Sequence, residues 1–492
     1  MITFIISLLL LIGGYFIYGK FAAKVAGIDP NRPTPVKSMA DGIDYVELST
    51  WKIFLIQFLN IAGLGPIFGA IMGVMYGPSA FLWIVFGTIF AGAVHDFMSG
   101  VMSLRMKGAS LPEIVGKELG GGIKLVMRIF ALLLMILVGA VFVYNPADLL
   151  AMLTPEHFSR LFWIIAIFAY YMLATLLPID KLIGRLYPVF GFALLFMAVG
   201  IMVMLFVHSS AVPEVWEEFS NHKPDAEANP IFPMMFVSIA CGAISGFHAT
   251  QSPMMARCLK SEKYARPVFY GAMVTEGVVA LIWAAAAVAF TGGYTQLQET
   301  LGNGSPAILV NNLSTGWLGT VGGVLAVLGV IAAPITSGDT ALRSARLIAA
   351  DFSRIKQKKI ANRLMVSVPI FVICFVVMLL PYDVLWRYFA WCNQALSVFT
   401  LWAITIWLAS RKRFYYISLL PALFMTVVTV SYILFAPEGF GLLTDYLFGL
   451  KIDYWIAIGA GVGVACAFLL MFYNKLQKLR GVDPENLDPQ LD

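Results

Sequence analysis

Four ionisable side chains stand inside stretches of sequence that are otherwise apolar. His95 and Asp96 are adjacent in "GAVHDFMSG", and His248 ends "CGAISGFH". Glu276 lies near the centre of a later apolar stretch. An ionisable group deep in a bilayer is costly, so it usually has a partner or a function. We predict ion coupling at His95, Asp96 and Glu276, with a structural ion pair or helix cap as the alternative for Asp96 and a hydroxyl partner for Glu276.

Two apolar stretches carry residues that weaken or break a helix. They are "NIAGLGPIFGAIMG" (60–73) and "SIACGAISGFHATQSPMM" (238–255). Proline removes a backbone donor, and glycine costs ~1 kcal/mol relative to alanine in a helix. A helix broken at mid-membrane exposes amides that favour an anion and carbonyls that favour a cation. The predicted substrate-binding residues around the two breaks are Gly63, Gly65, Pro66, Gly69, Gly242, Ser245, Gly246, His248, Thr250 and Gln251.

The same glycines allow a second interpretation. Gly65, Gly69 and Gly73 have the spacing of small residues that let helices pack closely. Close packing alone would require neither Pro66 nor a matching break later in the chain. We therefore predict interrupted helices at 63–66 and 242–246. For His248, the alternative to a site role is hydrogen bonding to carbonyls that the break exposes.

The composition is that of a polytopic membrane protein. Of the 492 residues, 60% are hydrophobic and 12% charged, whereas globular proteins have ~25% charged residues. Because a span needs ~20 mostly apolar residues, we predict an all-α fold of about 13 spans with no room for a soluble domain. The first span is expected to be retained, since no basic residue marks it as a cleaved signal peptide. The five cysteines form no CxxC pair and are interpreted as small apolar residues. The predicted spans are residues 3–20, 53–75, 79–102, 124–145, 161–178, 182–207, 232–257, 267–291, 317–341, 364–380, 385–409, 414–435 and 453–473.

The basic residues predict the orientation of these spans. Alternating the loops between the two sides puts all but four of the 33 Lys and Arg residues on one side. The exceptions are Arg160, Lys223, Arg387 and Lys451. Positive loops stay in the cytoplasm, so the N-terminus is predicted outside and the C-terminus in the cytoplasm.

The two interrupted stretches are five spans apart and therefore enter the membrane from opposite sides. This indicates two five-helix repeats of inverted orientation, residues 51–207 and 231–409, which is the arrangement of secondary transporters with a midplane site. Residues 1–50 add an N-terminal helix and loop, and 410–492 add two peripheral helices and a tail. Asn393, on the last helix of the second repeat, is predicted to reach the substrate site, with a hydrogen bond between helices as the alternative.

Three blocks of sequence resemble the bacterial carbon starvation (CstA) family. They are the region from "GLGPIFGAIMGVMYGPSAFLW" to "AGAVHDFMSGVMSLRMKG", the block "CGAISGFHATQSPMMAR", and "APITSGDTALRSARLIAADF". The resemblance implies an inner-membrane transporter induced by nutrient limitation, with members linked to peptide and pyruvate uptake. It also implies a relation to the amino acid–polyamine–organocation transporters, whose LeuT-like fold is a five-plus-five inverted repeat.

A second ion site follows from this resemblance. In LeuT-like proteins, hydroxyls at the position of "APITSGDTALRSAR" hold sodium together with carbonyls of the first repeat helix. The matching residues here are Thr336, Ser337 and Thr340, and Asp339 adds charge. Oxygen ligands suit such a hard cation. We therefore predict ion coupling at Thr336, Ser337 and Asp339, the alternative being that Asp339 pairs with Arg343 or Arg346.

Together these features predict secondary active uptake of a small carboxylate-bearing nutrient, a peptide or pyruvate, in a bacterial inner membrane. The coupling ion is a proton or sodium, and no cofactor, nucleic acid or enzymatic activity is expected. Expected partners are the substrate and the lipid bilayer, and the oligomeric state stays open. A starvation sensor without net transport is the main alternative. A protease is disfavoured because GxSxG, HExxH and GxGD are missing, and a channel because the sequence has no repeated filter.

Overall fold

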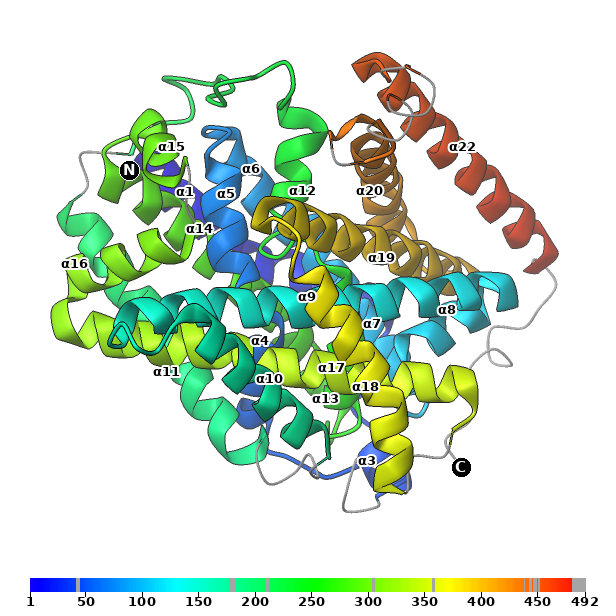
Figure 1. Ribbon diagram of the computed structural model, residues 1–492. Helices are drawn as coiled ribbons and strands as arrows, with labels where there is room; N and C mark the ends of the chain where they lie inside the picture. Colours follow the sequence, from blue (N-terminus) through cyan, green and yellow to red (C-terminus); the bar gives the residue numbers. More distant parts are fainter. Residues whose placement is uncertain are drawn as a thin grey trace.

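The computed structural model describes residues 1–40, 45–176, 183–208, 212–302, 306–355, 359–437, 439–441, 445, 449 and 452–479. Within these residues the regular elements are all helical (Figure 1). The first half of the chain contains α1 (Ile2–Phe16), α2 (Tyr18–Ala26), α3 (Pro35–Ser38), α4 (Thr50–Ile61), η1 (Gly65–Gly69), α5 (Ala70–Val74), α6 (Ser79–Phe86), η2 (Gly87–Gly92), α7 (Ala93–Arg105), α8 (Leu111–Leu119), α9 (Gly121–Leu153), α10 (Arg160–Leu176) and α11 (Ile183–Val207).

The second half of the described chain is also helical. It contains η5 (Ile231–Met235), α12 (Phe236–Ser238), α13 (Gly246–Ala256), η6 (Glu262–Tyr264), η7 (Arg266–Tyr270), α14 (Gly271–Thr291), α15 (Tyr294–Leu301), α16 (Pro306–Ala326), η8 (Val327–Ile331), α17 (Ala332–Ser353), α18 (Ile360–Val377), α19 (Tyr382–Ser410), α20 (Tyr416–Phe435) and α22 (Tyr454–Leu479). The η elements are single 3₁₀ or π turns, most of which continue directly into an α-helix.

The helices establish a multi-pass membrane protein. In the described part of the chain, ten helices are long and apolar enough to cross a membrane, or eleven if one bent pair counts as a span. Two of the thirteen predicted spans fall outside this set. The span predicted at 161–178 is the shorter apolar helix α10, and the one predicted at 232–257 is split into α12 and α13. The exact number of thirteen therefore stays a prediction, as do the proposed repeat boundaries.

The first predicted interruption is present, with its position shifted by a few residues. Helix α4 ends at Ile61 and the backbone becomes helical again at Gly65, with a bend of 53° between the two pieces. Pro66 was expected inside the break, but it is the second residue of the new helical turn. A proline costs little there, because the first amides of a helix have no intrahelical acceptor.

The second interruption is longer. Helix α12 ends at Ser238 and α13 begins at Gly246, so Gly246 starts the new helix instead of lying in the break. Gly242 has a φ of +106°, a backbone conformation that residues with a Cβ rarely adopt. The glycine at this position therefore allows the sharp turn between the two half-helices.

The two interrupted helices also pack tightly against each other. A Cβ added at Gly65 would lie 1.9 Å from the Cβ of Cys241, and one at Gly73 would lie 2.0 Å from Ile239. Gly69 lies against the carbonyl of the last residue of α12. The breaks and the close packing, which the sequence presents as alternatives, thus occur together. Figure 1 shows α5 beside α12 within the helical array.

The extra helices cover this core from outside. The N-terminal helix α1 packs against α14, and α22 packs against α20 at the edge of the molecule (Figure 1). The span predicted at 317–341 is part of a longer helical stretch, 306–353, in which the backbone leaves helical geometry at Gly319.

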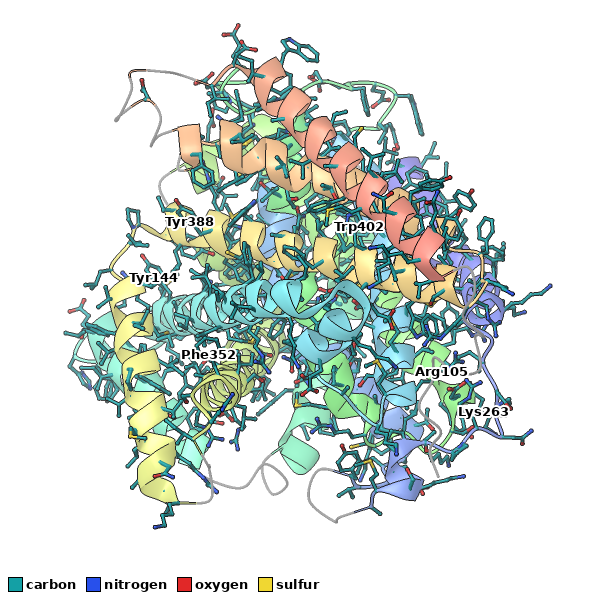
Figure 2. All side chains as sticks on the ribbon, turned by 90° about the vertical axis from the view of Figure 1, so that its right-hand side faces the viewer. Arg105, Tyr144, Lys263, Phe352, Tyr388 and Trp402 are labelled. Atoms are coloured by element: carbon teal, nitrogen blue, oxygen red, sulfur yellow. The ribbon has the colours of Figure 1, made fainter. Side chains whose placement is uncertain are left out.

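A buried ion network closes one end of the molecule. Glu262, which is 1% exposed, accepts from Arg105 Nε at 2.9 Å and from Arg32 Nη1 at 3.1 Å. Arg32 and Arg105 are among the basic residues predicted to be cytoplasmic. Figure 2 shows Arg105 and Lys263 near each other at one edge, with Tyr144 and Tyr388 toward the opposite edge.

Candidate functional site

Three of the predicted ionisable residues meet in the interior. Asp96 comes from α7, His248 from α13 and Glu276 from α14. His248 Nδ1 lies 2.9 Å from Asp96 Oδ2, and His248 Nε2 lies 3.4 Å from Glu276 Oε2. All three side chains are fully buried. The imidazole is thus held between two carboxylates, one from α7, which precedes the second break in the chain, and one from α14, which follows it.

His95 extends the cluster at the other oxygen of Asp96. Its Nδ1 lies 2.8 Å from Asp96 Oδ1. Adjacent residues on a helix point ~100° apart, so the sequence suggests that the two cannot face one partner directly. Instead they bind each other, and Asp96 uses its second oxygen for His248. The ion pairs of Asp96 that the described residues form are with His95 and His248, so the choice between ion coupling and a structural ion pair stays a prediction.

Asn393 occupies the second break from the facing helix α19. Its Oδ1 accepts from the hydroxyl of Ser245 at 2.8 Å and from the backbone N–H of Phe247 at 2.7 Å. Its Nδ2 donates to Cys241 Sγ at 3.1 Å. A side-chain oxygen therefore sits at the amide end of α13, where we predict that a substrate carboxylate binds.

Two participants in this break are not evident from the sequence. Cys241, interpreted there as a small apolar residue, accepts a hydrogen bond from Asn393. Thr88, from η2, donates to the carbonyl of Gly242 at 2.8 Å. The sequence does not reveal these roles, because the hydrogen-bond partner of each residue lies about 150 residues away in the chain.

Other predicted substrate residues make only local bonds. The hydroxyl of Thr250 donates to the carbonyl of Phe247 at 2.6 Å, and Gln251 Nε2 donates to the Thr250 hydroxyl at 3.0 Å. Both bonds lie within α13 and do not involve the residues of the break. Ser245 and His248, which precede them, make the cross-helix contacts.

The predicted sodium residues lie beside the first break. The Ser337 hydroxyl is 3.9 Å from the position that a Cβ would take at Gly63, and it is buried without a hydrogen-bond partner among the described residues. The Thr340 hydroxyl donates to the carbonyl of Ser337 at 2.9 Å. Asp339 Oδ1 lies 3.7 Å from Arg343 Nη2, which is the alternative that the sequence allows.

These contacts group the predicted residues into two places. Asp96, His248 and Glu276 belong to the second break, and Thr336, Ser337 and Asp339 share α17 near the first. Within the described residues, no three His, Cys, Asp or Glu side chains form a group that could hold a metal ion.

The fold is that of polytopic transporters with interrupted helices. A manganese transporter of Eremococcus coleocola aligns with a TM-score of 0.54 at 12% identity, covering 90% of this chain and 99% of that chain. Mhp1, a nucleobase-cation-symport-1 family transporter, aligns with a TM-score of 0.51 at 13% identity, covering 90% and 96%. Both are LeuT-like, so the expected all-helical, LeuT-like fold class is confirmed, whereas the count of 13 spans stays a prediction.

The sequence comparisons define the family. Residues 1–162, 149–303 and 294–432 match the profile of Carbon starvation protein CstA, and this chain belongs to that family. It is 44% identical over 352 residues to an uncharacterized membrane protein of Haemophilus influenzae, covering 62% of this chain and 95% of that one.

Relatives with named activities are more distant and longer. Peptide transporter CstA of Campylobacter jejuni is 30% identical, covering 55% of this chain and 47% of its own length. Pyruvate/proton symporter BtsT of Escherichia coli is 27% identical, covering 53% and 45%. The chain therefore spans about half the length of these two curated transporters.

Proposed function

We propose that this protein is a proton-coupled symporter that takes up a small carboxylate-bearing nutrient, pyruvate or a short peptide, by alternating access. The family, and the peptide and pyruvate transport for which its relatives are named, support a transporter with such a substrate. The distribution of basic residues supports placement in a bacterial inner membrane, with the N-terminus outside and the C-terminus in the cytoplasm.

The buried contact between Asp96, His248 and Glu276 carries the proposal of proton coupling. Two ionised carboxylates and one neutral imidazole would bury two negative charges, and uncompensated buried charge is strongly unfavourable. The cluster lowers its charge by holding protons that its two carboxylates and the imidazole share. Such interacting sites titrate as one unit. A change in water access to the cluster would therefore load or release a proton.

The break next to this cluster supplies the substrate site. Asn393 Oδ1 accepts from the Ser245 hydroxyl and from the amide of Phe247. A substrate carboxylate presents the same acceptor chemistry with a full negative charge, which the N-terminal end of a half-helix favours. We propose that the carboxylate takes the place of the Asn393 oxygen. The replacement couples substrate to His248, which lies one helical position beyond Phe247.

Sodium coupling has a separate basis at the first break. The buried hydroxyl of Ser337 lies beside Gly63 and has no hydrogen-bond partner among the described residues, so its oxygen could bind a cation. Two observations favour the proton for this chain. The imidazole–carboxylate cluster is fully buried and contacts the break directly, whereas Asp339 faces Arg343, whose positive charge opposes a cation.

Uptake by purified protein in proteoliposomes tests the proposal. Radiolabelled pyruvate and alanylalanine are the probes, and their methyl esters compete. We expect accumulation of one acid driven by an inward proton gradient, with poor competition by the neutral esters. Equal competition by acids and esters would refute the carboxylate site. A lack of counterflow with either acid, despite ligand binding, would favour a sensor without net transport.

A further inference from the structure

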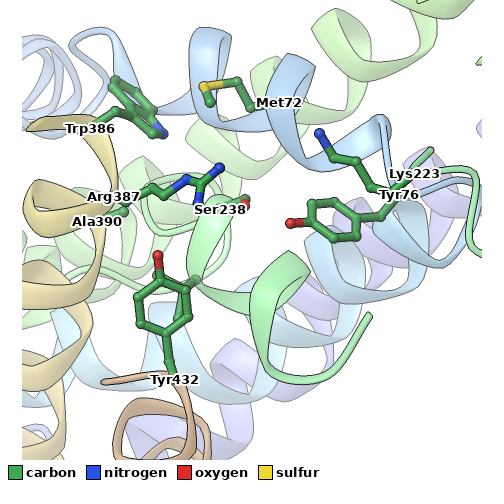
Figure 3. A pocket seen from close by; sticks show the side chains of 9 residues that line it. Met72, Tyr76, Lys223, Ser238, Trp386, Arg387, Ala390 and Tyr432 are labelled. Atoms are coloured by element: carbon green, nitrogen blue, oxygen red, sulfur yellow. The ribbon is translucent and has the colours of Figure 1, made fainter. Parts of the chain in front are cut away.

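Two hollows outside the proposed substrate site differ in size and in lining. The polar one, which Figure 3 shows with Lys223 and Arg387 in its walls, leaves about 30 Å³ of accessible space. That is room for about two water molecules. The other is an apolar groove that leaves about 100 Å³ and is partly open to its surroundings. Of the two, only the groove can take part of an organic molecule.

The groove lies between the C-terminal helix α22 and the helices α8, α9 and α19. Eight of its nine lining residues are apolar, and the ninth is Lys475. The ring of Trp402, from α19, packs against Phe468 of α22 with the ring centres 5.9 Å apart, and Figure 2 shows Trp402 beside α22. Leu119 and Ile123 line the groove from either side of the turn between α8 and α9.

The predicted orientation places the groove in the cytoplasmic half of the membrane. α19 and α22 both run from the outer side to the cytoplasm, and the groove is lined by residues from the second half of each helix. From Phe468 to Lys475, α22 rises ~10 Å at 1.5 Å per residue. Half of the hydrocarbon core is ~15 Å thick. The groove therefore runs from the membrane surface into the inner leaflet, along the direction of a lipid acyl chain.

The cytoplasmic end of the groove carries a positive charge. The ammonium of Lys475 donates to the backbone carbonyl of Glu118, at the end of α8. Because this acceptor is neutral, the bond leaves the charge of the ammonium and two of its three N–H donors for another ligand. The side chain of Glu118 is buried and does not line the groove. Lys475 is thus fixed in position at the rim.

The start of α9 adds to this positive end. α9 begins at Gly121, and no side chain caps its first amides, which give a helix N-terminus about half a positive charge. A Cβ added at residues 120–122, all glycine, would meet nothing within 4 Å, so the space beside the turn is open. Figure 1 shows the end of α22, which carries Lys475, beside α8. Donors from two elements therefore face the same end of the groove.

We propose that this groove binds an anionic glycerophospholipid of the inner leaflet. One acyl chain lies along Trp402, Phe468 and Phe472, and the phosphate lies at Lys475 and the start of α9. Charge complementarity selects this occupant, because the apolar walls suit a chain and a positive end without a lining carboxylate suits a phosphate. A zwitterionic lipid carries its own ammonium and gains less from the same end. The bound lipid joins the peripheral helix α22 to α8 and α9.

Titration of delipidated, purified protein with lipids, followed by native mass spectrometry, tests the headgroup. Phosphatidylglycerol and phosphatidylcholine with identical acyl chains are the probes. We expect the wild type to bind phosphatidylglycerol about tenfold more tightly, and Lys475→Gln to reduce this preference to about twofold. Lys478→Gln is the control, because Lys478 lies one turn farther along α22 and does not line the groove. Equal affinity of the wild type for both lipids would overturn the proposal.

Met471→Trp tests the apolar part of the groove. The larger ring should weaken binding of both lipids about fourfold, equivalent to one methylene kept out of the groove. Leu470→Trp is the control, since Leu470 is 65% exposed against 61% for Met471 but does not line the groove. Glycerol 1-phosphate, the same phosphate without chains, should not displace the lipid.

Three results would refute the lipid site. They are phosphatidylglycerol binding that is unchanged in both Lys475→Gln and Met471→Trp, displacement of the lipid by glycerol 1-phosphate, and a dimer that Met471→Trp converts to a monomer while lipid binding stays unchanged. The last result would make this face an interface between two copies of the chain. All of these measurements are made without substrate, so their failure leaves the proposed uptake untouched.

Discussion

The two interrupted helices differ in the length of their breaks and in their surroundings. At the first break, Gly63 is flanked by Phe142 and the hydroxyl of Ser337. At the second, polar side chains from three other helical elements converge, including Asp96, Glu276 and Asn393. Helix-breaking residues therefore create an opening in the hydrogen-bonded backbone, and side chains supplied by other helices decide which chemistry the opening can do.

This difference assigns separate tasks to the breaks. The second break combines a helix N-terminus with an imidazole between carboxylates, which suits an anion and a proton. The first offers a hydroxyl and backbone carbonyls, which suit packing or a hard cation. The following substitutions test this asymmetry.

The largest effect is expected from Asp96→Asn. The amide keeps the shape of the side chain but cannot carry the proton, so gradient-driven uptake should fall ~100-fold, as for loss of one positioned proton-transfer group. Equilibrium binding should change less than about threefold, since no contact of the proposed carboxylate site is removed. Ser99→Ala is the control, because among the described residues the Ser99 hydroxyl donates to the backbone carbonyl of Asp96 and to no side chain of the cluster. Equal loss of uptake and binding would indicate a structural role.

A smaller effect is expected from Gly246→Ala. The added Cβ would lie 2.5 Å from the carbonyl oxygen of Asn393 and 2.6 Å from the backbone nitrogen of Ser397, so α13 and α19 must separate. Overpacking of this kind costs roughly 1–3 kcal/mol. Thermal unfolding of the purified protein measures it. Gly459→Ala, where a Cβ meets nothing within 4 Å, is the matched control and should be neutral or slightly stabilising. Equal stability of the two variants would mean that the break is not packed as described.

Asn393→Ala should lower the stability of the protein and should change how much bound substrate stabilises it. It removes the acceptor of the Phe247 amide, comparable to loss of a helix N-cap, at a cost of about 1 kcal/mol. If the carboxylate replaces the Asn393 oxygen, substrate should partly restore stability in this variant. Thermal unfolding with and without pyruvate measures both quantities. Loss of stability without recovery by any acid would place the carboxylate elsewhere.

The smallest effect is expected from Ser337→Ala. If protons drive uptake, removing this hydroxyl should change the uptake rate less than about twofold, since a buried hydroxyl without a partner contributes no hydrogen bond. Uptake is measured in sodium and in choline buffers. A large loss confined to sodium buffer would transfer ion coupling to the first break and reverse the comparison.

Sequence patterns predict the local features well because they depend on neighbouring residues. The glycines predict both breaks to within a few residues, whereas Pro66 lies just after the first break; the alternation of spans drawn from the basic loops stays a prediction. The contacts across helices are different. Ser245 and Thr250 are equally plausible in the sequence, but only Ser245 faces Asn393. The pairing of Asp96 with His248 depends on how α7 meets α13 and on no local pattern. Lys223 and Arg387 appear in the sequence only as exceptions to the charge rule.

Movement of protons with the substrate tests the central claim most directly. Proteoliposomes that enclose a pH-sensitive dye, with no initial ion gradient, are given an inward gradient of pyruvate or alanylalanine in sodium-free buffer. Protein-free liposomes correct for passive entry of the neutral acid. We predict acidification of the interior that requires the protein, persists without sodium and is lost in Asp96→Asn. Uptake of the same substrate that requires sodium and leaves the internal pH unchanged would contradict the account.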